Sequence, residues 1–448
     1  MSGAHHPAWT RGRRPVLFYV ASAFAILVLF SLFGNLPYRL KPIHPNHDPT
    51  HDFSKPLPVS VEGRNWTYSP ARDSRNLGLS DEQCDAAFPG LYTEIDRTRD
   101  YFGPRSIRQK QVKLYEKDTG YYNHSQVHVL IYNGQMYIID EVKGACDKQR
   151  GHAGLANLYR SIISVPDPST IPNVEFILDT EDTPTQHMPK NRVVWGWTRP
   201  MDKMGTWVAP DFDGWAFPNP DLGAYVSFRE RVKLVEQPFE AKDARAVWRG
   251  TVVLNSLRGS LVNATQDKEW ADVQKMRDAR MHMADFCKYQ FPIHTEGNSW
   301  SGRLRYLQNC HSAVVVHQPL KYQAHYYDLL VADGPDQDGQ NYIKVANDFS
   351  DLEEKIEYYR ANPLEAERIA NNSVSAFRDR YLTPAAEACY WRRMIKNWAE
   401  VQAFEPTAYT DVKQKDGSTW KKQRGLDWEI YAHPDSNYGL HFPVDEKA

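Results

Sequence analysis

The amino-acid sequence predicts an α/β protein built from two lobes. Its 448 residues, of which 41% are hydrophobic, are enough for about two domains of ordinary size, each with its own core. Strand-like apolar runs alternate with helical spacing in two stretches, residues 76–240 and 241–404. A single long apolar run lies near the N-terminus, apart from both stretches. Together these features predict an anchor, a stem and two α/β lobes.

Residues 16–34 are the predicted membrane anchor. They include 18 consecutive apolar or small residues without a charge, about the minimum for crossing a bilayer. Three arginines precede the run and basic residues follow it more thinly, so the positive-inside rule places residues 1–15 in the cytosol. No small-x-small site follows, which favours an uncleaved anchor over a signal peptide. We therefore expect a single-pass type II protein of the Golgi or endoplasmic reticulum, anchored in the lipid bilayer, with its bulk in the lumen.

Two further patterns agree with a lumenal location. N-glycosylation motifs begin at Asn65, Asn123, Asn263 and Asn371. The five cysteines are scattered without a Cys-x-x-Cys pair, which argues against zinc and is compatible with one or two disulfides in an oxidising lumen. They are Cys84, Cys146, Cys287, Cys310 and Cys389.

The stem and the first lobe follow the anchor. Residues 35–75 are rich in Pro, His, Asn and Asp without apolar periodicity, which predicts an extended stem. In the first lobe, residues 127–140 read as a β-hairpin centred on Asn133-Gly134. Residues 152–165 have helical spacing, and residues 173–180 form a short buried strand that ends in acids.

The second lobe repeats this alternation. Residues 244–251 and 312–318 read as strands, and residues 301–310 as a helix between them. Residues 348–382 have helical spacing, with Ser350 as N-cap and Glu353 completing a capping box. A last helix over 384–401 closes the lobe, and the polar tail, residues 405–448, is expected to be irregular.

Two polar corners of the second lobe suit a diphosphate. Ligands of open α/β sheets lie beyond the carboxyl ends of the strands. If Ser301 caps the helix that follows, its free N–H groups and Arg303 can bind phosphate oxygens. At the other corner Gly250 permits close approach, while Arg249 and Thr251 supply donors. Taken singly, each corner could equally be a surface ion pair or a helix cap.

Five sequence blocks, taken in order, carry a family resemblance. They are residues 248–251, 294–317, 320–330, 348–363 and 389–394. In that order they resemble the conserved blocks of glycosyltransferase family 90, over a region from about Tyr121 to Trp398. That family contains fungal capsule-associated xylosyltransferases and animal protein O-glucosyltransferases.

The resemblance implies a GT-B-like fold, with two Rossmann-like lobes and an interlobe cleft, and an inverting enzyme that uses a UDP-sugar without a metal or other cofactor. The family's Arg-Gly-Ser block, which contacts the nucleotide, corresponds to Arg249, Gly250 and Thr251, and Arg258 is the nearest match to a following arginine. The family's Ser-x-Arg block around the donor corresponds to Asn298, Ser299, Trp300, Ser301, Gly302 and Arg303.

An inverting transfer needs one carboxylate that takes the proton of the acceptor hydroxyl. By the resemblance this base is an aspartate just before the first lobe's conserved helix, where Asp147 is the nearest acid. Asp179 and Asp182, at the end of the next strand, are rivals, although a strand-end aspartate more often caps a turn. We prefer Asp147 to Asp182.

The loop around Asp211-Phe-Asp213 offers a different interpretation. Asp-x-Asp can bind manganese and would suggest a GT-A enzyme. The loop also contains Trp215 and Phe217, which are better suited to stacking on a sugar or lining the acceptor site, so we expect no metal.

These observations predict a glycosyltransferase that moves xylose or glucose from a UDP donor to a glycan or protein hydroxyl. The formal net charge of −2, from 54 basic and 56 acidic residues mixed along the chain, argues against nucleic acid as a partner. The alternative is an inactive lumenal carbohydrate-binding or scaffold protein with the same fold. A hydrolase is disfavoured because no paired carboxylates have a recognisable spacing.

Overall fold

The computed structural model describes residues 59–61, 64–115, 126–142, 148–183, 191–217, 219–332 and 337–433. The predicted cytosolic tail, the anchor and most of the stem lie outside these ranges, as does Asp147. Within them, no helix is long and apolar enough to cross a membrane. The described residues belong to one compact unit, which contains both large sheets.

The first large sheet has six strands in the order β17-β4-β3-β5-β6-β8. Its strands are β3 (Gln126–Tyr132), β4 (Gln135–Glu141), β5 (Val174–Asp179), β6 (Trp195–Gly196), β8 (Trp207–Val208) and β17 (Leu426–Asp427). β3 runs antiparallel to β4 and β5, whereas β5, β6 and β8 are parallel. The predicted hairpin is confirmed, because Asn133 and Gly134 join β3 to β4 with positive φ angles of 50° and 71°.

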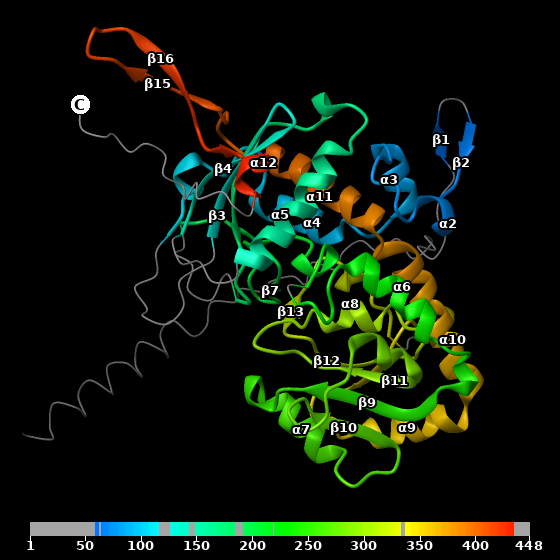
Figure 1. Cartoon of the computed structure of the whole chain (residues 1–448). Helices are drawn as coiled ribbons and strands as arrows, with labels where there is room; N and C mark the ends of the chain where they lie inside the picture. The colour runs from blue at the N-terminus through cyan, green and yellow to red at the C-terminus, as the bar shows by residue number, and fades with distance from the viewer. Residues whose placement is uncertain are drawn as a thin grey trace, which may run out of the picture. The chain divides into compact units, whose positions relative to one another are not determined.

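Helices α3 (Asp81–Ala87), α4 (Thr93–Phe102), α5 (Lys148–Ile163) and α11 (Pro384–Val401) pack together beside this sheet (Figure 1). Aromatic residues fill the contact between α11 and the sheet. Phe176 and Trp195 stack at 3.5 Å between ring centroids, and Trp398 lies edge-on to Trp195 at 5.6 Å. The prediction that α11 closes the second lobe is therefore wrong, since its apolar face is buried on the first sheet.

The second large sheet has five parallel strands in the order β10-β9-β11-β12-β14. They are β9 (Asp243–Gly250), β10 (Ala271–Lys275), β11 (Tyr289–His294), β12 (Val315–Gln318) and β14 (Ile343–Ala346). This confirms the predicted α/β class. The chain changes its direction of progress across the sheet between β9 and β11, so the carboxyl ends of these two strands border the crevice where such sheets bind ligands.

The helices that accompany the second sheet are α7 (Ser256–Ala264), α8 (Arg303–Leu307), α9 (Leu352–Ala361) and α10 (Pro363–Ser373). α8 is much shorter than expected, and Gly302 rather than Ser301 is its N-cap. The expected capping box of α9 is wrong too, because the Ser350 hydroxyl donates to Asp348 and Asp351 is the N-cap. Pro363 starts α10 as a separate helix, since proline has no N–H to continue α9.

The remaining elements are short, except for α6 and a π-helix. They are β1 (Val59–Val61), β2 (Arg64–Trp66), α2 (Pro70–Asp73), β7 (Arg199–Pro200), α6 (Tyr225–Val235), β13 (Tyr322–Gln323), the π-helix Val374–Tyr381, β15 (Tyr409–Lys413), β16 (Thr419–Gln423) and α12 (Trp428–Tyr431). The prediction of an irregular tail is wrong for its first part. β15 and β16 form a hairpin, and β17 then adds to the edge of β4.

Two disulfides confirm the expectation from the cysteine count. Cys84–Cys389 joins α3 to α11, and Cys287–Cys310 joins the segment before β11 to the residues after α8. Cys146 lies outside the described residues.

Candidate functional site: an arginine corner at the carboxyl ends of β9 and β11

Two arginines from different helices meet at the crevice of the second sheet. The guanidinium carbons of Arg258, in α7, and Arg303, in α8, lie 5.9 and 5.6 Å from the ring centroid of Trp248 in β9. We call these three residues the arginine corner. The structure thus brings together two of the arginines that the sequence predicted for the donor site.

Backbone carbonyls hold Arg258 in place. Its Nε donates to the Glu296 carbonyl at 2.9 Å, and its Nη1 donates to the Thr251 carbonyl at 3.1 Å. The side chain is buried, and this burial lowers the pKa of Arg258. Carbonyl dipoles orient the guanidinium but leave its full positive charge unneutralised.

The positive charge of Arg303 is even less compensated by polar groups than that of Arg258. Its Nε and Nη1 are buried and make no hydrogen bond within the described part of the chain. Burial, followed by the charge of Arg258, lowers the pKa of Arg303 to about 9. Among the described ranges neither arginine of the corner forms an ion pair, so the corner holds two positive charges that an anionic ligand would stabilise.

Arg249 does not join them. Its Nη2 forms an ion pair with Asp272 at 2.7 Å, and its Nη1 donates to the carbonyls of Trp248 and Asp272. Successive side chains of a strand point to opposite faces, so Trp248 faces the corner while Arg249 is directed toward β10. Of the predicted Arg-Gly-Thr block, Thr251 contacts Arg258 of the corner, through its carbonyl oxygen.

Gly250 and Gly302 are both required by close approach. A Cβ on Gly250 would collide with the Trp248 indole, and a Cβ on Gly302 would collide with Oδ2 of Asp213. The other members of the predicted donor segment vary in exposure. Ser299 and Trp300 are buried, Ser301 is half-buried and Asn298 is exposed.

His294 is a site residue that sequence reasoning missed. It ends β11, is fully buried, and stacks nearly parallel to His317 at 6.2 Å. Burial, then the charges of His317, Arg303 and Arg258, hold the pKa of His294 well below its usual range. Neither ring nitrogen has a partner among the described residues. Its position at the carboxyl end of a buried strand was the available signal.

The Asp-x-Asp loop holds α8 in place, and α8 follows the segment that is predicted to surround the donor. Arg305 of α8 is fully buried and pairs with Asp211 at 3.0 Å and with Glu387 of α11. The Tyr306 hydroxyl donates to Asp213 at 3.0 Å, and burial raises the pKa of Asp213 to about 7. Both aspartates are thus interior groups, and no cluster of three potential metal ligands occurs in the part of the chain described.

The candidate bases lie near the start of α5. Asp182, which follows β5, forms an ion pair with Arg150 of α5 at 3.0 Å, and its side chain is 40% exposed. Asp179 is fully buried and accepts hydrogen bonds from Gln126 and Tyr115, so it is closed to a substrate. Asp147 precedes Arg150 by three positions in the sequence and lies outside the described residues.

The molecule is therefore an α/β protein with a parallel sheet, whose crevice carries two arginines that form no ion pair among the described residues. Comparison with known proteins gives the family. The sequence profile of Glycosyl transferase family 90 matches residues 92–426, well over half of the chain. The chain therefore belongs to glycosyl transferase family 90, as its sequence blocks predicted.

Three relatives illustrate the similarity. Protein O-glucosyltransferase 3 of Rattus norvegicus is 24% identical over 344 residues, 70% of this chain and 63% of that protein. Protein O-glucosyltransferase 1 of Rattus norvegicus is 26% identical over 210 residues, 43% and 52% of the two chains. Protein O-glucosyltransferase 2 of Danio rerio is 25% identical over 307 residues, 63% and 57%. The matched part spans less than two thirds of each of these relatives.

Proposed function

We propose that the protein is an inverting glycosyltransferase of GT-B type that moves a sugar, xylose or glucose first, from a UDP donor to a glycan or protein hydroxyl without a metal. The single observation that carries this proposal is the arginine corner. Two guanidinium groups that have no carboxylate partner among the described residues lie at the crevice where open α/β sheets bind ligands.

The corner has the chemistry that a departing diphosphate requires. Guanidinium groups can bind two phosphate oxygens at once, and Arg303 has unused donors. As the bond to the sugar breaks, negative charge develops on UDP, and fixed positive groups stabilise that charge more than they stabilise the bound substrate. His294, kept neutral by burial beside the arginines, is a further group that can donate one hydrogen bond and accept another.

Asp147 remains the preferred base, with Asp182 as the rival. Asp182 is accessible, but Arg150 occupies its carboxylate, whereas a base must be free to accept the proton of the acceptor hydroxyl. Comparing transfer by Asp147→Asn and Asp182→Asn separates the two. Loss of transfer in Asp182→Asn alone would make Asp182 the base.

We also propose that the chain is anchored through residues 16–34 in the membrane of the Golgi or endoplasmic reticulum, with its catalytic part in the lumen. Two disulfides suit an oxidising compartment. Asn65, Asn263 and Asn371 of the glycosylation motifs are all exposed, as acceptors of a glycan must be.

The decisive test is UDP release by the purified full chain with a panel of UDP-sugars, in EDTA and in manganese. We expect turnover in EDTA, and a fall of roughly 100-fold or more in Arg303→Ala, the scale seen when one donor to a developing charge is removed. Arg277→Ala, at an exposed arginine, is the matched control. Strict dependence on manganese would reject the metal-free mechanism. UDP binding without release from any donor would favour the inactive carbohydrate-binding alternative.

A further inference from the structure

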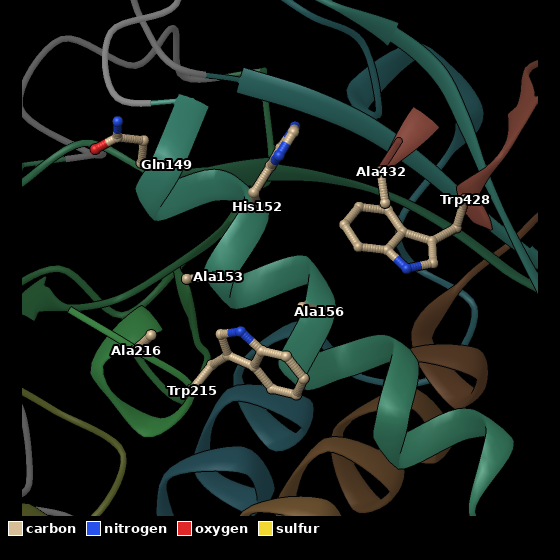
Figure 2. Close-up of a pocket in the computed structure, with 8 residues that line it drawn as sticks. All are labelled: Gln149, His152, Ala153, Ala156, Trp215, Ala216, Trp428 and Ala432. Carbon is tan, nitrogen blue, oxygen red and sulfur yellow. The ribbon is translucent and has the colours of Figure 1, made fainter. Parts of the chain in front are cut away.

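A concave site lies on α5. Its lining comes from three parts of the chain: α5, the loop after Phe212, and α12. The residues are Gln149, His152, Ala153, Ala156, Trp215, Ala216, Trp428 and Ala432. Figure 2 shows the indoles of Trp215 and Trp428 on the two sides of the stretch of α5 that carries Ala153 and Ala156. We call this site the tryptophan pocket.

Trp215 is a fixed wall of the pocket. The Arg160 guanidinium lies 4.9 Å from its ring centroid, and Arg160 also donates to the Gly214 carbonyl and to Asn157. Cation–π contact on one face holds the indole, yet 39% of the residue remains exposed. The exposed part of this indole can contact a ligand.

Trp428 is an equally fixed wall. Its ring packs edge-on against His152 at 6.1 Å and lies 5.9 Å from Tyr431. α12 is held against the first sheet, because the Tyr431 hydroxyl donates to Glu141 at 2.6 Å. α12 begins beyond residue 426, where the family match ends. This wall therefore lies outside the matched region.

The lining indicates the chemistry of the occupant. None of the described residues that line the pocket is a carboxylate, a lysine or an arginine, so the pocket suits an uncharged ligand. The small side chains of the four lining alanines leave space beside the indoles, and the cavity volume of about 280 Å³ is just below the usual range for ligand pockets. The C–H face of a pyranose ring packs well on the electron-rich face of an indole, while the side-chain amide of Gln149 can bond its hydroxyls.

The position of the pocket connects it to transfer. Gln149 and His152 belong to the first turns of α5, the same end of the helix at which Arg150 binds Asp182. Asp147 precedes Gln149 by two positions. A sugar held in the pocket therefore lies near the end of α5 at which Arg150 binds Asp182, one of the two candidate bases.

We propose that the tryptophan pocket is an acceptor subsite that binds one neutral pyranose unit, so that the acceptor is a glycan rather than an unmodified polypeptide. The role in transfer rests on the proposed function, whereas the binding of the pyranose does not. The competing occupant is an apolar side chain of a protein acceptor.

Binding of methyl pyranosides of glucose, galactose, mannose and xylose to the full chain, followed by saturation-transfer NMR, tests the proposal. We expect at least one to bind, with its affinity reduced tenfold or more in Trp215→Ala and in Ala156→Leu, which fills the pocket from a half-buried position of α5. Trp420→Ala, at an exposed tryptophan of β16, is the matched control and should leave binding unchanged. Calorimetric UDP binding should be the same in all three variants.

Three outcomes would overturn the proposal. The first is that no pyranoside of the panel binds, and the second is a loss of less than threefold in both pocket variants. The third is binding of N-acetylphenylalaninamide, but of no pyranoside, with the same dependence on Trp215. If the wild-type protein bound a pyranoside but not UDP, this result would instead contradict the proposed function and leave the pocket assignment standing.

Discussion

Arg303 and Arg305 stand two positions apart on α8 and differ in every contact. Arg305 pairs with Asp211 and Glu387, whereas Arg303 forms no ion pair among the described residues and lies near the same Trp248 ring as another cation, Arg258. Burial opposes the charge of both side chains, but only Arg305 is compensated inside the protein. We therefore expect one arginine to stabilise the fold and the other to destabilise it until a ligand is bound.

Substitution by methionine should separate these roles. Arg303→Met should raise the free energy of unfolding of the ligand-free protein by about 1 kcal/mol, as removal of a strained functional group commonly does. It should also abolish stabilisation by UDP. Arg305→Met should lower the free energy of unfolding by about 3–5 kcal/mol, because it leaves buried carboxylates without their cation. Urea denaturation with and without UDP measures both effects, and a less stable Arg303→Met would contradict the assignment.

Glu296, which follows β11, should make stability depend on pH. Burial raises its pKa from 4.5 to about 7, against the opposing hydrogen bonds from the N–H groups of Tyr322 and Lys321 to one carboxyl oxygen. The folded state therefore holds a proton that the unfolded state has lost between these pH values, so stability falls as the pH rises from about 4.5 to 7.

Glu296→Gln keeps the accepting oxygen and removes the charge. The free energy of unfolding of the variant should equal that of the wild type at pH 4 and should be higher by roughly 1–3 kcal/mol at pH 8. Denaturant titrations over this pH range give the comparison. A difference that does not change with pH would mean that the carboxyl group does not titrate as described.

At the scale of elements, α8 is placed by contact with the 211–217 loop. Gly302 packs directly on Asp213, and Tyr306 one turn later bonds the same carboxyl group. The loop thus sets the position of the segment that carries Arg303. Because α8 has only five residues, tertiary contacts and not helix propensity must hold it.

Gly302→Ala should displace this segment. The added methyl collides with Asp213, so we expect UDP affinity to fall about tenfold or more, with a loss of stability of about 1–3 kcal/mol from overpacking. The double variant Gly302→Ala/Asp213→Ala, which lacks the colliding carboxylate, should recover part of the UDP affinity. Gly259→Ala, where no atom lies within 4 Å, is the control. Calorimetry with UDP measures the four proteins.

At the scale of the whole described unit, the last described segment of the chain packs against the first large sheet. β17 adds to the edge of β4, and Arg424 binds the carboxylate of Glu175 in β5 with two hydrogen bonds of 3.0 and 2.9 Å. Glu175 is almost fully buried, and it also contacts His128 at 2.8 Å. The tail is therefore part of the core structure of the first sheet.

Arg424→Ala tests whether the contact between this segment and the first sheet stabilises the fold. It removes one cation from a buried carboxylate, so we expect a loss of about 3 kcal/mol in the free energy of unfolding. Lys421→Ala, at an exposed lysine of the same hairpin, should change it by no more than about 0.5 kcal/mol. Thermal and urea denaturation provide the measurement, and equal stabilities of the two variants would show that the tail is dispensable for the fold.

Much of this protein could be predicted from local sequence. The Asn133-Gly134 hairpin, the strand over residues 174–179 and the helix over residues 384–401 follow from turn chemistry and periodicity, which act over a few residues. The order of five blocks was enough for the family, and Arg258 and Arg303, two of the arginines predicted for the donor site, lie close together.

Only the tertiary structure decided which charges meet. Arg249 is paired with Asp272, 23 positions away, and α11 is buried on a sheet whose main strands precede it by more than 170 residues. His294 becomes a site residue because His317 and two arginines surround it. Periodicity shows that a face is apolar or that a side chain is charged, but it does not show the partner. Partners are selected by packing between segments far apart in the chain, and for this protein that packing separates the free arginines of the corner from the paired arginine beside them.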